Sequence, residues 1–298
     1  MKKKIGIIIL VVIVMIIAIG IIGKRVGEPK QEGKEQFKIV TTFYPMFIIT
    51  QNITQGAQNV EMVNMADINT GCLHDYTLST TDMKKLEKAD VIVQNGLGLE
   101  NFIDKVLSTY SEVQMIDSSK NITSKIEENG ETNSHIWTSI SNYILQVEEI
   151  AYRLSQVNPE NEEVYKRNKE SYIKRLKELQ ERYQTELTNL KGKKAICLNE
   201  AFSYLAKEVG LEIISVETNH EESSLSAERM KELIEIMKKE NIKSILVDQE
   251  DNLKSAQTLA NETGAKIYEL QSGLIGDVSN DSYLQAMQNN LRTLKEIL

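Results

Sequence analysis

The sequence predicts an α/β fold of two lobes, each with a mainly parallel sheet, joined by one long rigid helix and preceded by an N-terminal hydrophobic anchor. Three observations support this prediction. Two sets of short apolar runs alternate with helical patterns, which is typical of parallel sheets. A long charged stretch between the two sets has helical spacing. The chain has 298 residues and 41% hydrophobic content, enough for two lobes with their own cores.

The N-terminus carries an unbroken apolar run from Ile5 to Ile22, directly after a cluster of lysines. At 1.5 Å per residue a helix of this length covers about 27 Å, close to the hydrocarbon thickness of a bilayer. We expect residues 1–26 to be an uncleaved anchor with its lysines on the cytoplasmic side, followed by a polar tether at 27–36. A cleaved signal peptide is the alternative, although Ala18-Ile19-Gly20 is a poor cleavage site. In both cases the rest of the chain lies outside the cytoplasm.

The N-terminal lobe is expected over residues 37–138. Four runs of strand length lie in it: FKIVTT (37–42), VEMVNM (60–65), DVIVQN (90–95) and VQMID (113–117). Candidate helices lie between them at 44–56, 80–89 and 99–110. The C-terminal lobe is expected over residues 193–298. Its runs are KKAICLN (193–199), EIISVE (212–217), SILVDQ (244–249) and KIYELQ (266–271), again with helical stretches between them.

Residues 139–192 are expected to connect the lobes. Apolar residues recur there at helical spacing among solvated charges, with one break at Asn158-Pro159. We expect the second half, about 160–190, to be a single helix that forms a stiff strut packed along both lobes. A coiled coil is the alternative, but the apolar register is too irregular to sustain heptads.

Composition and motifs argue against two classes of function. A formal net charge of −8 argues against nucleic acid, whose phosphates require a basic surface. The sequence has neither a Gly-x-Ser-x-Gly elbow nor a His-Glu-x-x-His pair, so no motif supports an enzyme. Asn95-Gly96-Leu97-Gly98 lacks the third glycine of a dinucleotide fingerprint, and we expect its glycines to permit a tight turn.

Five blocks of the sequence resemble a known family. They are FKIVTTFYPMFIITQNI, LHDYTLSTTDMKKLEKADVIVQNGLGLENFIDKV, SHIWTSISNYI, NEAFSYLAKEVGLEI and ETGAKIYELQ, in this order from about Phe37 onward. With them the chain resembles the zinc/manganese solute-binding proteins of bacterial metal ABC transporters, the cluster A-I substrate-binding proteins. The resemblance implies two α/β lobes joined by a long helix, with one metal ion in the cleft between them. It also implies an ABC permease as partner, and we expect a monomer.

The resemblance assigns the first metal-ligand position to His74 and the second to His135. Leu73 stands where the family usually has a proline before the first histidine. Neutral imidazole is a good ligand for zinc, and loops at strand ends converge on a cleft between lobes. Trp137 would share one face of an extended segment with His135, which predicts that the indole packs behind this ligand.

The other two ligand positions depart from the family pattern. The third, usually histidine or glutamate, holds Asn199 with Glu200 beside it, and the fourth, usually aspartate, holds Gln271. Asn and Gln can coordinate only through a neutral carbonyl oxygen, so Glu200 would be the anion of the site, unless Asp277 or Asp248 shifts to complete it. The alternative for Glu200 is an acid that interacts only with a helix N-terminus.

Three other features carry weaker signals. His220 lies in a polar acidic loop and is expected to be exposed to solvent. Cys72 and Cys197 each precede a ligand position by two residues, which leaves a disulfide between them or thiolate ligation open. Residues 117–134 hold no histidine, so this stretch does not favour zinc over manganese.

Two functions follow from these predictions. The first is a membrane-anchored receptor that captures Zn²⁺, with Mn²⁺ as the alternative, and presents it to an ABC permease. The second is a protein of the same fold whose metal site is lost or altered, and which serves in interaction or adhesion.

Overall fold

The structure is a computed structural model that describes residues 36–71, 73–74, 76–103, 113–128, 130–216, 225–251 and 253–297. The expected anchor at 1–26, Cys72, His220 and most of the helix expected at 99–110 lie outside the described residues. Within the described part, no helix combines the length and the apolar character that crossing a bilayer requires. Residues 1–36 and 37–298 are separate units, and the fold below is that of the second unit.

The first sheet has four parallel strands in the order β2-β1-β3-β4. Their bounds, β1 Phe37–Thr41, β2 Val60–Asn64, β3 Val91–Gln94 and β4 Gln114–Asp117, confirm the first set of predicted strands. The chain goes from β1 to its neighbour β2 and then crosses to β3 on the other side of β1. Open α/β sheets bind ligands at such a change of direction, which here lies at the carboxyl ends of β1 and β3.

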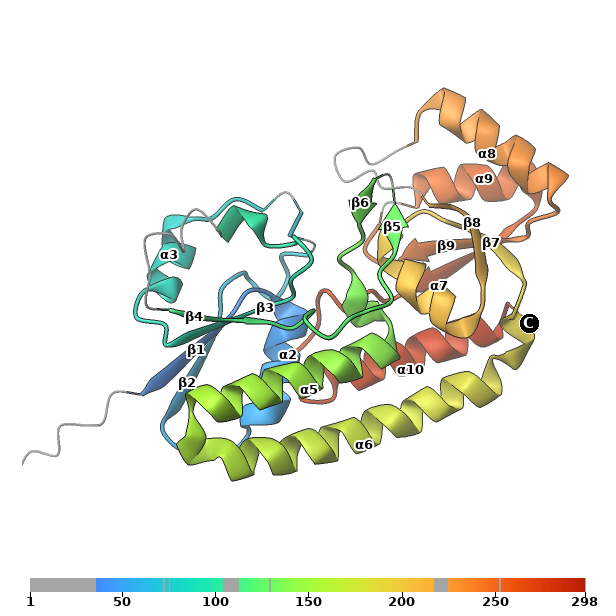
Figure 1. Cartoon of the computed structure of the whole chain (residues 1–298). Coiled ribbons are helices and arrows are strands. Elements are labelled where there is room, and N and C mark those ends of the chain that lie inside the picture. Colours follow the sequence, from blue (N-terminus) through green and yellow to red (C-terminus); the bar gives the residue numbers. More distant parts are fainter. Residues whose placement is uncertain are drawn as a thin grey trace, which may run out of the picture. The chain divides into compact units, whose positions relative to one another are not determined.

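Two helices follow the first strands of this sheet: α2 at Tyr44–Thr54 and α3 at Thr80–Leu86 (Figure 1). Pro45 lies in the first turn of α2, and Ser79 with Asp82 forms a capping box at α3. These residues explain where the two helices begin.

The second sheet has the order β10-β9-β7-β8, and its strands are again parallel. The strands β7 Lys194–Cys197, β8 Glu212–Val216, β9 Ser244–Asp248 and β10 Lys266–Leu270 confirm the second predicted set. Its helices are α7 Ser203–Val209, α8 Ala227–Lys239, α9 Lys254–Thr263 and α10 Ser282–Lys295. A 3₁₀ turn, η4 at Glu200–Phe202, joins the carboxyl end of β7 to α7.

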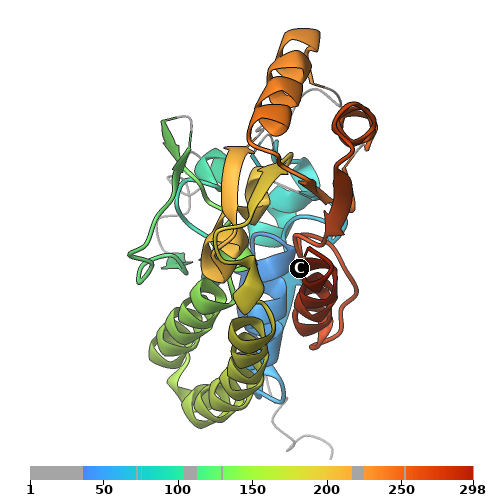
Figure 2. The ribbon, with the colours of Figure 1, turned by 90° about the vertical axis from the view of Figure 1, so that its right-hand side faces the viewer.

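Two antiparallel helices, α5 at Ile140–Val157 and α6 at Glu162–Glu186, lie between the two sheets in the chain. The 3₁₀ turn η2, Pro159–Asn161, separates them because proline cannot continue α5. As the spacing predicts, α6 is one unbroken helix, and it has 25 residues. It packs against α2 and α10, and thus lies along both lobes (Figure 1, Figure 2). A last 3₁₀ turn, η3 at Thr188–Leu190, precedes β7.

Tyrosines from α5, α6 and α10 join the two lobes in one core. The rings of Tyr143 and Tyr283 stack with centroids 3.5 Å apart, and the Tyr143 hydroxyl lies 3.1 Å from that of Tyr172. All three side chains are buried. Large aromatic rings contribute strongly to core stability. Because these tyrosines contact one another, the three helices form a common layer under both sheets.

Two features differ from the sequence predictions. Residues 117–134 contain an antiparallel hairpin, β5 Glu127–Glu128 with β6 Glu131–Thr132, which their polar sequence does not predict. The expectation of an extended segment through His135 is wrong, because His135 is the N-cap of a 3₁₀ helix, η1 at Ile136–Thr138. The N–H and the hydroxyl of Thr138 both donate to the His135 carbonyl and close this turn.

Candidate metal centre

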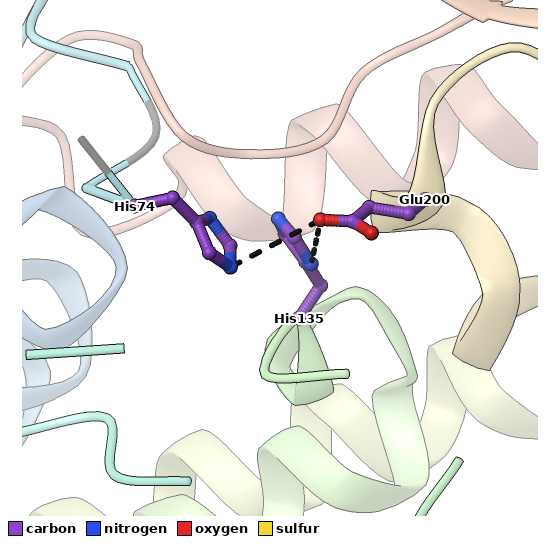
Figure 3. A group of neighbouring side chains, drawn as sticks. All are labelled: His74, His135 and Glu200. Carbon is purple, nitrogen blue, oxygen red and sulfur yellow. Dashed lines mark ion pairs between the residues drawn. The ribbon is translucent and has the colours of Figure 1, made fainter. Parts of the chain in front are cut away.

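Three of the side chains predicted as metal ligands lie close together. His74 lies on the loop between β2 and α3, His135 follows the β5–β6 hairpin, and Glu200 begins η4 after β7. One potential ligand atom of each lies within 4.8 Å of the others (Figure 3). Within the described ranges, this is the one such cluster of three or more His, Cys, Asp or Glu residues. Loops of both lobes therefore contribute to a single site.

The cluster is nearly compact enough to hold one ion. Glu200 Oε1 lies 3.9 Å from His74 Nε2 and 4.0 Å from His135 Nδ1. The two imidazole rings stack with centroids 5.0 Å apart and planes inclined by 28°. In a tetrahedral zinc site with bonds of about 2.0–2.2 Å, neighbouring ligand atoms lie about 3.4 Å apart. The distance from Glu200 to His74 Nε2 exceeds this spacing by roughly half an ångström. The distance from Glu200 to His135 is measured at Nδ1, the ring nitrogen that also lies 3.1 Å from Asn133 Oδ1.

The cluster is open to solvent on one side. The side chain of His74 is 29% exposed and that of Glu200 is 12% exposed, whereas His135 is buried. The Ser134 hydroxyl lies 3.3 Å from His74 Nε2. As expected, the buried indole of Trp137 lies beside His135, with ring centroids 5.1 Å apart. The cluster is thus open to solvent on the side of His74, while His135 is enclosed by the protein interior.

Asn199, at the third ligand position, has both amide atoms engaged outside the cluster. Its side-chain oxygen accepts from the Ala201 N–H at 2.9 Å and caps η4, and its amide nitrogen donates to Asp251 at 3.0 Å. The side chain that meets the histidines is that of the next residue, Glu200 (Figure 3).

Gln271, at the fourth position, is also bonded to other amides. It donates to Gln249 Oε1 at 2.9 Å, and its own oxygen accepts from Asn289 at 3.2 Å. These three side chains line a cavity of about 340 Å³. The side-chain oxygen that could coordinate a metal is therefore already an acceptor in this amide network.

The two aspartates considered as replacements lie outside the cluster. Asp248 is buried at the end of β9, and burial raises the pKa of its carboxyl to about 6. Asp277 accepts from the Ser282 hydroxyl and the Ser279 N–H, and these hydrogen bonds lower its pKa. Each carboxylate thus has local partners of its own.

Cys197 is a buried free thiol and forms no disulfide in the structure. Its Sγ donates to the Asn199 carbonyl at 2.9 Å, and burial raises the pKa of the thiol to about 12. Because thiolate is the form that binds metals, this environment argues against ligation by Cys197. Cys72 and His220 lie outside the described residues.

Two contacts of the histidines were not among the predicted site residues. Asn133 accepts from the His135 backbone and lies beside its ring, and Ser134 contacts His74. The only sequence signal is that both polar residues directly precede His135. Their contacts depend on the turn into η1 and on the approach of the two lobes, which spacing does not reveal.

Comparison with known proteins identifies the family to which the sequence is similar. A family model described as "ZnuA: Zinc-uptake complex component A periplasmic" matches residues 39–297. A curated relative, "Zinc-binding protein AdcA" of Streptococcus pyogenes, is 31% identical over 294 residues, which cover 89% of this chain and 56% of the relative. The chain thus spans little more than half the length of this relative.

Solved structures share the fold. FpvC from Pseudomonas aeruginosa in complex with Mn²⁺ has a TM-score of 0.78 at 26% identity, and the match covers 88% of this chain and 97% of that one. The laminin-binding protein Lmb of Streptococcus agalactiae, described as bifunctional with adhesin and metal-transporting activity, has a TM-score of 0.75 at 27% identity. That match covers 88% of this chain and 98% of Lmb.

Proposed function

Because the chain belongs to the zinc-uptake periplasmic component family, we propose that it captures a divalent metal ion outside the cytoplasm and delivers it to an ABC permease. The observation that carries this proposal is the cluster of His74, His135 and Glu200, whose ligand atoms lie within 4.8 Å of one another. Two neutral imidazoles and one carboxylate are a donor set that binds divalent transition metals.

Zinc is the metal that this donor set favours. Imidazole suits zinc, whereas manganese is held better by carboxylate and carbonyl oxygens, and Glu200 is the one acid of the cluster. Three protein ligands also leave a fourth tetrahedral position for water, as in other open zinc sites. The amides of Asn199 and Gln271 are engaged elsewhere, so the proposed site includes neither of them.

The proposed mechanism is binding and release without chemical turnover. Exposure of His74 gives the ion a route to solvent, and burial of His135 keeps that side of the site in place. The apolar segment at 5–22 would tether a monomeric chain to the outer face of the cell membrane, near its permease.

Metal content tests the proposal directly. The full chain, purified in detergent without a histidine tag, is expected to hold about one zinc after loading, measured by mass spectrometry. Zinc should bind at least about tenfold more tightly than manganese, as the order of divalent-metal affinities predicts. His74→Ala and His135→Ala should each lose most of the bound metal, and His220→Ala serves as the matched control because we expect it to lie outside the site.

Adhesion is the second candidate function, favoured by the structural likeness to Lmb and by the neutral residues at the third and fourth ligand positions. If loading leaves far less than one metal per chain and His74→Ala behaves like the parent, metal capture is excluded. Adhesion then becomes the leading explanation.

A further inference from the structure

The side chain of Asn133 contacts residues of both lobes. Among them are His135 and Glu200, the two least exposed of the three proposed ligands. Its Oδ1 accepts from the His135 backbone N–H at 2.8 Å and lies 3.1 Å from His135 Nδ1. Its Nδ2 donates to the Glu200 carbonyl at 2.9 Å and to Glu128 Oε2 at 2.6 Å. Asn133 is buried, so these contacts are protected from water.

These partners determine which way the amide of Asn133 points. A backbone N–H can only donate, so the atom facing the His135 backbone must be the amide oxygen. A carbonyl and a carboxylate can only accept, so the atom facing Glu200 and Glu128 must be the amide nitrogen. The two sides require the same orientation, and a flipped amide would place donor against donor and acceptor against acceptor.

The orientation of the amide sets the protonation of the ring beside it. His135 Nδ1 faces an oxygen that can only accept, so Nδ1 must carry the proton when the imidazole is neutral. The lone pair then lies on Nε2, the nitrogen that can coordinate a metal. We infer that Asn133 is a positioning residue that holds His135 in the Nδ1–H tautomer and ties it to the Glu200 segment. Its role in metal binding rests on the proposed function.

The backbone of Asn133 and the side chain of its partner Glu128 are also held by hydrogen bonds. Its carbonyl accepts from the Tyr204 hydroxyl at 2.9 Å, and its N–H donates to the Ile126 carbonyl at 2.8 Å. Glu128, which receives the Asn133 amide, also accepts from the Ser203 hydroxyl at 2.6 Å. The amide is thus held by the hairpin and by the second lobe together, and it links the His135 loop to η4.

Nitrogen-15 NMR of the imidazoles measures the tautomer without any metal. The full chain has three histidines, so a histidine-labelled sample in detergent gives few signals, and His135→Gln identifies those of His135. At about pH 8, where histidine is neutral, the parent should show His135 with a protonated Nδ1. Asn133→Ala should shift His135 toward the Nε2–H form that imidazole prefers in water, and should weaken zinc binding by about 10- to 100-fold.

Asn133→Asp separates the effect of Asn133 on the His135 tautomer from its link to the Glu200 segment. It keeps an acceptor for His135 but loses both donors, so the Nδ1–H tautomer should persist while zinc affinity recovers only in part. Asn121→Ala is the matched control, because Asn121 also donates to a glutamate, Glu149, but is not among the contacts of the cluster. It should change neither the tautomer nor the affinity.

A parent with the proton on Nε2, or a tautomer that does not respond to Asn133→Ala, would overturn the inference. If the alanine variant does not fold, loss of the Nδ1–H form in Asn133→Asp would overturn it instead. A parent that binds no zinc refutes the proposed function and with it the metal role, whereas the imidazole spectra still decide the tautomer. The two failures are therefore distinguishable.

Discussion

Glu200 is the acidic member of the cluster with His74 and His135. A divalent ion bound there would retain roughly one positive charge, and without the carboxylate it would retain two. The amides of Asn199 and Gln271 supply no charge, and their oxygens already accept hydrogen bonds from Ala201 and Asn289. The electrostatic contribution to binding therefore depends on one side chain.

We expect Glu200→Gln to weaken zinc binding by at least about 100-fold, because it removes the anion while it keeps the shape. Asn199→Ala and Gln271→Ala should each cost less than about tenfold, since neither removes a proposed ligand. Competition with a chromophoric chelator measures all three. An effect of Gln271→Ala as large as that of Glu200→Gln would mean that the amide network rearranges on binding and that Gln271 joins the site.

We expect Glu100 to make the free energy of unfolding depend on pH. Its buried carboxylate accepts from Asn95, Gly96 and Thr42, yet burial raises its pKa from 4.5 to about 7. Between pH 4.5 and 7 the folded state thus keeps a proton that the unfolded state releases, and the free energy of unfolding falls as pH rises through this window.

We therefore expect Glu100→Gln to reduce this slope by up to about 1.4 kcal/mol per pH unit. Urea denaturation at several pH values measures the slope. Asp248, whose pKa is raised to about 6, adds a slope of the same sign, and Asp248→Asn provides the comparison. A steeper slope in Glu100→Gln would contradict the prediction.

At the scale of elements, η1 links the candidate site to the interior. His135 caps this short helix, Trp137 lies within it, and the indole N–H donates to the Ser272 carbonyl at 2.9 Å. Tyr283 of α10 donates to the Trp137 carbonyl at 2.8 Å. A change at His135 therefore reaches the indole and the second lobe through one turn of backbone.

We expect zinc to change tryptophan fluorescence in a saturable way, since ligation by His135 alters a ring 5.1 Å from the indole. The chain has one tryptophan, so the signal reports this site alone. His74→Ala and His135→Ala should lose the response, and His220→Ala should keep it. Tight binding seen by calorimetry without any change in fluorescence would place the metal away from His135.

At the scale of the whole second unit, several contacts limit relative motion of the lobes. α6 packs along α2 and α10, and the tyrosine layer is continuous between them. Hydrogen bonds also run from α2 to the loop before α10, namely Tyr44 to the Asp277 carbonyl, Gln51 to the Val278 carbonyl and Asn52 to the Asn280 carbonyl. A wide hinge opening would break these bonds and expose the core.

We therefore expect zinc to change the radius of gyration only slightly, through small lobe tilts and loop movement. Small-angle scattering with and without zinc measures this change. His74→Ala with zinc is the control for nonspecific effects of the ion. A contraction typical of hinge closure, present in the parent and absent in His74→Ala, would show that the helical layer bends.

The elements follow from local patterns in the sequence. The strands, the 25-residue helix and the break at Pro159 are predicted because apolar spacing and proline act within a few residues. His74, His135 and Glu200 are candidate ligands because short blocks of the sequence resemble those of a known family. That two of these blocks would meet the third could be expected only from family resemblance, since no spacing along the chain measures distance in space.

The tertiary structure decided which of two neighbours faces the histidines. Asn199 and Glu200 are adjacent in sequence, and the turn after β7 assigns the first to the cap of η4 and the second to the cluster. The hairpin and the contacts of Asn133 were likewise beyond prediction, because two-residue strands carry no periodic signal. Glu128 and the His135 N–H, which orient the Asn133 amide, lie in its own lobe, whereas its bond to the Glu200 carbonyl forms only once the lobes have packed.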